Sequence, residues 1–121
     1  MRLGDTFLMP VPLQDCDHLW IVISDPEAYG GTFVIVNVTG DYFRAGKECV
    51  LGPKDHPWIA KECFVTFADA LEITPQRSAH LDQLVGKLIK MQGLLEKAAL
   101  ERIIGCAKKS RAFPTGYKKY L

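Results

Sequence analysis

The chain has 121 residues, of which 48% are hydrophobic and 24% are charged, and its 15 basic and 14 acidic side chains give a net charge of +1. These values are ordinary for one globular domain, and they exclude both a disordered chain and a uniformly basic nucleic-acid binder. No apolar run approaches the roughly 18 residues that a membrane helix needs, and Gly4 and Asp5 interrupt any signal segment at the start. We therefore expect a cytoplasmic protein with no membrane partner.

The first part of the chain predicts short antiparallel strands separated by proline and glycine turns. The strongest signal is the second strand, because its Leu-Trp-Ile-Val-Ile run is continuously apolar, as in a strand buried on both faces. A polar connection, Leu13–Asp17, precedes it. Leu71–Ile73 either extends the fifth strand or forms a bend. The predicted strands cover Gly4–Met9, His18–Ser24, Phe33–Thr39, Glu48–Leu51 and Cys63–Ala70.

From Thr74 the apolar period becomes helical. Thr74 is a suitable N-cap and Pro75 a suitable first helical residue. The apolar spacing predicts a helix that continues to Ile89, and Gln92-Gly93 is a plausible break before a second helix. Strands followed by one or two helices predict a mainly β, α+β domain: a small antiparallel barrel or curled sheet of about five strands (1–73), a helical part (74–110) and a tail (111–121) that packs only in part.

The four cysteines are scattered and form no Cys-x-x-Cys pair. They predict reduced thiols rather than a zinc site, and no cofactor is indicated. No local feature would lower a thiol pKa. The residues are Cys16, Cys49, Cys63 and Cys106.

Two histidines are candidates for proton transfer. His18 opens a buried strand; a lone histidine there is more often hydrogen-bonded to a neighbour, but its near-neutral pKa also suits catalysis. His56 lies between Asp55 and Pro57 in a polar loop. It either fixes that loop or carries part of a site. Two histidines near one phosphodiester could act as base and acid.

Polar residues also end the third predicted strand. Asn37 and Thr39 are two residues apart and therefore share a face of that strand. A threonine at this position most often bonds the following turn, but both side chains could hold a phosphate oxygen.

The remaining binding candidates lie in a loop and at the C-terminal end. Trp58 either stacks on a nucleobase or pins its own loop, and Lys54 beside it could hold a phosphate. The basic residues Lys108, Lys109 and Arg111 either contact phosphates or form a solvated helix end.

Several of these pieces together resemble a known family. They are Gly4-Asp5, the His18–Ser24 strand, Val36-Asn-Val-Thr39, and the Leu51–Ala70 segment with its His-Pro-Trp-Ile sequence. Over about the first 70 residues the chain resembles the core of the MazF/PemK-like toxins, endoribonucleases of toxin–antitoxin modules. The resemblance implies an SH3-like barrel, a homodimer, a cognate antitoxin and metal-independent cleavage of single-stranded RNA.

The resemblance also implies site residues. The family's phosphate-binding threonine corresponds to Thr39, whereas its arginine corresponds to His18, which is a departure. A histidine stabilises phosphate charge only when protonated, but it can also transfer a proton. We therefore expect an endoribonuclease that uses His18, His56 and Thr39; the alternative is an inactive barrel that binds a protein or nucleic acid.

Overall fold

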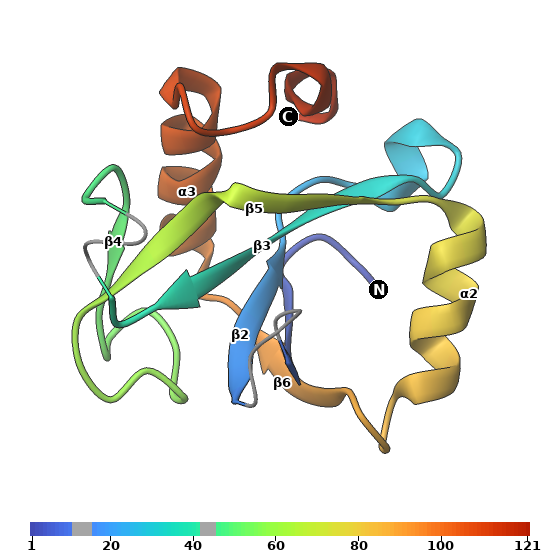
Figure 1. Ribbon diagram of the computed structural model, residues 1–121, viewed down its shortest axis with the longest axis horizontal. Coiled ribbons are helices and arrows are strands. Elements are labelled where there is room, and N and C mark those ends of the chain that lie inside the picture. Colours follow the sequence, from blue (N-terminus) through green and yellow to red (C-terminus); the bar gives the residue numbers. More distant parts are fainter. Residues whose placement is uncertain (11–15, 42–45) are drawn as a thin grey trace.

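The computed structural model describes residues 1–10, 16–41 and 46–121. Within these residues, six antiparallel strands form one sheet in the order β4-β5-β3-β2-β1-β6, which curls into a half-barrel (Figure 1). The strands are β1 (Asp5–Pro10), β2 (Asp17–Val22), β3 (Phe33–Thr39), β4 (Val50–Leu51), β5 (Cys63–Ile73) and β6 (Lys90–Leu94). The helices are α2 (Pro75–Leu84) and α3 (Lys97–Lys109), with 3-10 turns η1 (Pro26–Tyr29) and η2 (Thr115–Tyr120).

The predicted fold class, a small barrel-like antiparallel sheet followed by helices, is confirmed. Five strands lie close to the predicted ranges, and β5 continues through the Leu71–Ile73 segment. Most of the predicted Leu13–Asp17 connection lies outside the described residues. The curl has a local cause: β3 pairs Ile35 with Leu71 and then Asn37 with Thr66, so β5 holds extra residues at this point and bends.

The predicted first helix is too long. As predicted, α2 begins with the Thr74 hydroxyl accepting a hydrogen bond from the backbone N–H of Arg77, at 3.3 Å. It ends at Leu84, however, and Gly86 takes a φ of +82°, a conformation that stops a helix. Strand β6 follows and pairs with β1, so the predicted break at Gln92-Gly93 lies inside a strand that the sequence analysis missed.

The sheet has two faces because successive side chains of a strand point to opposite sides. On β2, Leu19 and Ile21 belong to a core that includes Ile103 of α3, whereas Trp20 and Val22 belong to a second core that includes Leu81 of α2. We call these the α3 face and the α2 face. Figure 1 shows the two helices at opposite ends of the curled sheet.

The C-terminal tail packs on the α3 face. Phe113 is buried, and its ring meets those of Phe67 and Tyr117 edge-on at 6.0 and 6.4 Å. Tyr117 and Tyr120 are half-buried, which confirms the partial packing predicted for 111–121. None of the helices in the described residues has the length and apolar character required to span a membrane.

Candidate functional site

His56 is buried on the α3 face, and both of its ring nitrogens are engaged. The backbone N–H of Trp58 donates to Nδ1 at 3.0 Å, so Nδ1 carries no proton and Nε2 carries one. Nε2 lies 2.9 Å from the Thr6 hydroxyl oxygen and 3.0 Å from the Gln92 carbonyl oxygen. The Thr6 hydroxyl in turn donates to the Gly93 carbonyl at 2.8 Å.

This environment keeps His56 neutral. Burial lowers the pKa of the imidazole below its ordinary value of 6.5, and the hydrogen bond to the Gln92 carbonyl opposes that shift only in part. A neutral ring whose two nitrogens bond to the protein has no nitrogen left to exchange a proton with a substrate. His56 therefore joins its loop to β1 and β6.

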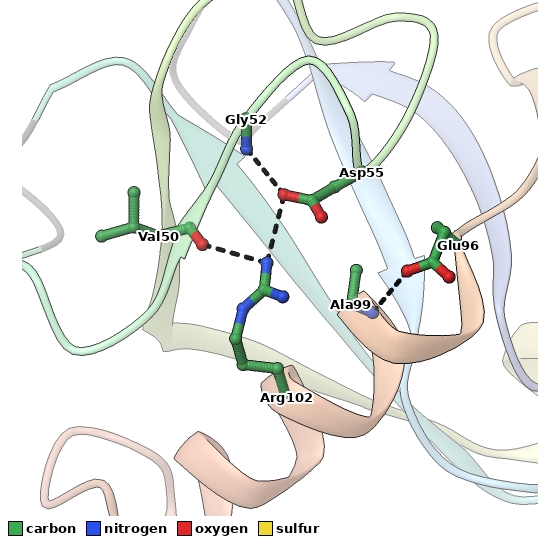
Figure 2. A network of polar contacts seen from close by, with 6 residues as sticks. All are labelled: Val50, Gly52, Asp55, Glu96, Ala99 and Arg102. Atoms are coloured by element: carbon green, nitrogen blue, oxygen red, sulfur yellow. Dashed lines mark hydrogen bonds and ion pairs between the residues drawn. The ribbon is translucent and has the colours of Figure 1, made fainter.

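A second network fixes the same loop to α3 (Figure 2). The buried carboxylate of Asp55 accepts from the backbone N–H of Gly52 at 2.8 Å and from Nη2 of Arg102 at 3.1 Å. Glu96 caps the start of α3 through the backbone N–H of Ala99, at 3.0 Å. The loop that carries two predicted binding residues is therefore held rigidly at both Asp55 and His56.

The two predicted binding residues of this loop, Trp58 and Lys54, lie on the protein surface. Trp58 is 42% exposed and Lys54 is exposed. Lys54 lines a shallow groove of about 520 Å³ together with Glu62 and Arg102. The loop therefore exposes the Trp58 ring and the Lys54 ammonium group to solvent, while Asp55 and His56 hold its backbone in place.

On the α2 face, the strand pairing brings together a different set of polar residues. Asn37 on β3 lies between Trp20 on β2 and Thr66 on β5. Continuing the antiparallel register of β2 and β3 by two residues places His18 opposite Thr39. We call His18, Asn37, Thr39 and Thr66 the polar cluster; all four residues are buried.

Asn37 and Thr66 form the inner pair of this cluster, and their side chains have no hydrogen-bond partner among the described residues. Asn37 has 0% and Thr66 has 2% of its surface exposed. Within the described part of the chain, neither the Nδ2 nor the Oδ1 atom of Asn37 has a partner, and the Thr66 hydroxyl has none either. Leaving a buried polar group unpaired costs about 1–3 kcal/mol, so this arrangement requires an explanation.

The outer pair of the cluster retains slight contact with solvent. His18 is 8% and Thr39 is 9% exposed. Nδ1 of His18 donates to the Val38 carbonyl at 3.1 Å, and Nε2 lies 3.7 Å from Sγ of Cys16. The Thr39 hydroxyl oxygen accepts from the backbone N–H of Asp41 at 3.1 Å, which is the turn contact that such a threonine most often makes.

The structure does not bring the two candidate histidines together. His18 shares the α2 face with Trp20, because both are even-numbered residues of one regular strand. His56 bonds to Thr6, which pairs with Ile21 and therefore lies on the α3 face. With the sheet between them, His18 and His56 cannot act on the same phosphate as a base and acid pair.

The basic residues predicted to bind phosphate lie away from the polar cluster. Lys108 and Lys109 end α3, whose buried residues pack on the α3 face, and Arg111 follows this helix. All three side chains are exposed. They form a solvated cationic end of the helix on the other side of the sheet.

The buried cysteines are poor nucleophiles. Burial, together with a hydrogen bond to Cys106, raises the pKa of Cys49 to about 12, and burial raises the pKa of Cys63 to about 11. Both remain thiols at neutral pH, in agreement with the prediction that nothing activates them. Among the described residues, no three side chains of the metal-binding types gather in one place.

Sequence analysis missed Thr66. A threonine in a β-strand carries no functional signal, and only the pairing of β5 with β3 shows that it lies beside Asn37. Comparison with known proteins adds no further residue, because no family model matches the sequence and no curated protein sequence is significantly similar to it.

Proposed function

We propose that the chain is a metal-independent endoribonuclease whose centre is the polar cluster on the α2 face. The observation that carries the proposal is the unpartnered Asn37 and Thr66 pair beside His18 and Thr39. Three of these four residues, His18, Asn37 and Thr39, are also candidates for catalysis or RNA binding by their type and position in the sequence. The resemblance to the MazF/PemK-like toxins assigns the phosphate to Thr39, at the edge of this cluster.

In this proposal, His18 is the general base. Nδ1 keeps its proton and donates it in a hydrogen bond to the Val38 carbonyl, so in the neutral ring Nε2 is the nitrogen that can accept a proton. Nε2 removes the proton of a ribose 2′-hydroxyl, and the resulting oxygen attacks the adjacent phosphorus. The bond to the 5′-oxygen breaks, giving a 2′,3′-cyclic phosphate and a 5′-hydroxyl whose proton comes from water.

Donors on the same face would stabilise the phosphate. The Thr39 hydroxyl oxygen already accepts from Asp41, so its own proton is directed elsewhere and can donate to a phosphate oxygen. Asn37 Nδ2 supplies a second donor from deeper in the cluster. Such preorganised donors act where charge develops during the reaction.

The test is cleavage of a long single-stranded RNA in the presence of EDTA. We expect products with 2′,3′-cyclic phosphate ends and no cleavage where a single 2′-deoxynucleotide replaces the attacking ribose. Replacing His18 with alanine should reduce the rate by a factor on the order of 10² to 10⁴. His80→Ala, which removes an exposed histidine of α2, is the matched control and should leave the rate unchanged.

A second function remains the alternative: an inactive barrel that binds a protein or nucleic acid. The exposure of Trp58 on a rigid loop favours it, because a fixed aromatic side chain is a good anchor for a partner. In that case, RNA would not be cleaved, and Trp58→Ala rather than His18→Ala would weaken binding. Homodimerisation and a cognate antitoxin belong to the endoribonuclease proposal, and native mass spectrometry of the chain tests the dimer.

A further inference from the structure

A groove with a volume of about 590 Å³ lies between α2 and the sheet. Its apolar residues come from three strands and from the helix. Leu71 is 37% exposed there, although the neighbouring Ala70 and Ile73 of β5 are buried. The groove therefore exposes apolar surface to water. Its apolar residues include Met9, Ile35, Leu71, Ile73 and Leu81.

The polar side of this groove is formed by donors from α2. Arg77 and His80 line it, together with the amides of Gln76 and Gln83, and the described residues of its lining include no carboxylate. One guanidinium nitrogen of Arg77, Nη1, donates to the Glu72 carbonyl at 2.8 Å. The other N–H groups of its planar guanidinium group can donate hydrogen bonds to a carboxylate.

Glu72, the β5 residue whose backbone carbonyl bonds to Arg77, is not among the lining residues of the groove. The Glu72 carboxylate is turned to the C-terminal tail, where the Tyr120 hydroxyl donates to it at 2.6 Å. Glu72 pairs with Val34, a residue of the α3 face. The groove thus combines an apolar floor with a cationic rim.

We propose that this groove binds a small amphipathic acid. The apolar part of the ligand lies against Leu71 and Met9, and its carboxylate meets Arg77 and His80. The volume is within the range of about 300–1,000 Å³ that is typical of small-molecule sites. Charge complementarity selects an anion over a neutral or cationic molecule of the same length. The proposal does not depend on RNA cleavage.

The test is calorimetric titration of the full chain with octanoate, octanol and octylammonium, which share one alkyl chain. Octanoate should bind at least tenfold more tightly than the other two. Arg77→Gln should weaken octanoate binding about tenfold, as expected for the loss of a charge-assisted hydrogen bond, and leave octanol binding unchanged. Lys87→Gln, which removes an exposed cation outside the groove, should change neither.

A third variant fills the groove instead of removing a contact. Ala79 lines the groove from an exposed helical position, so Ala79→Trp keeps α2 intact and should abolish the binding of all three probes. The proposal is overturned if octanoate does not bind, if the three probes bind equally, or if Arg77→Gln behaves like Lys87→Gln. It is also overturned if Ala79→Trp still binds octanoate with wild-type affinity.

Discussion

Two pairs of buried polar residues, one on each face of the sheet, differ in a single respect. On the α3 face, His56 and Thr6 have every polar side-chain atom bonded to the protein. On the α2 face, Asn37 and Thr66 are equally buried, yet three of their polar atoms have no partner in the described residues. The first pair joins a loop to two strands, whereas the second contributes nothing of this kind to the fold.

On this difference we assign a structural role to His56 and propose a functional role for the polar cluster. A buried histidine surrounded by hydrogen bonds stabilises the conformation that it bonds to. A buried amide without partners destabilises the chain, so its presence is best explained by a ligand or a water molecule that completes its hydrogen bonds. Burial alone would not have distinguished His56 from the polar cluster.

The largest loss of stability is expected from removing His56. His56→Ala removes the acceptor of the Trp58 N–H and one of the two hydrogen-bond partners of the Thr6 hydroxyl, and it opens a cavity beside the loop. We expect the free energy of unfolding to fall by about 2–4 kcal/mol in urea denaturation. His80→Ala, which removes an exposed side chain of α2, should change it by less than about 0.5 kcal/mol. Similar values for the two variants would contradict a structural role for His56.

A smaller loss is expected from Thr6→Val, which replaces a hydroxyl by a methyl group of nearly the same size. The variant removes one donor to the Gly93 carbonyl and one partner of His56 Nε2. Urea denaturation should show a loss of about 1–3 kcal/mol. No loss would mean that the hydroxyl is dispensable, and the contrast between the two faces would then disappear.

The pH dependence of stability sharpens the same comparison. Because burial lowers the pKa of His56 below 6.5 in the folded state, the unfolded chain binds a proton more readily than the folded chain. The contribution of His56 to stability is therefore complete above about pH 6.5 and decreases as the pH falls toward its folded-state pKa. His56→Gln should flatten this decrease between about pH 7 and pH 5, and His80→Gln should not. Equal slopes in all three proteins would contradict the assignment.

Much of the fold could be predicted because it depends on local signals. The proline and glycine turns separated the first five strands, and Thr74 with Pro75 marked the start of α2. Strand β6 could not be predicted, since Lys90–Leu94 has no β-branched residue and includes Gly93, and only pairing with β1 makes it a strand. Gly86 was the one local sign that the helix stops before Ile89.

The candidate site could be predicted only in part. Asn37 and Thr39 share a face by strand alternation, which a sequence reveals. The contact between His56 and Thr6 spans 50 positions, and the pairing of Asn37 with Thr66 depends on the register of β3 and β5. Neither contact is visible in the local sequence, so sequence analysis assigned His18 and His56 to one site although they lie on opposite faces of the sheet, and it omitted Thr66.

The central claim is that the α2 face keeps polar atoms unpartnered for a ligand, and the most direct test is the unfolding free energy of Thr66→Val. The account predicts that this variant is as stable as the wild type or more stable by about 1 kcal/mol, because valine removes an unpaired hydroxyl from a buried position. A loss of more than about 1 kcal/mol, comparable with that of Thr6→Val, would show that the Thr66 hydroxyl is bonded within the fold and would contradict the claim.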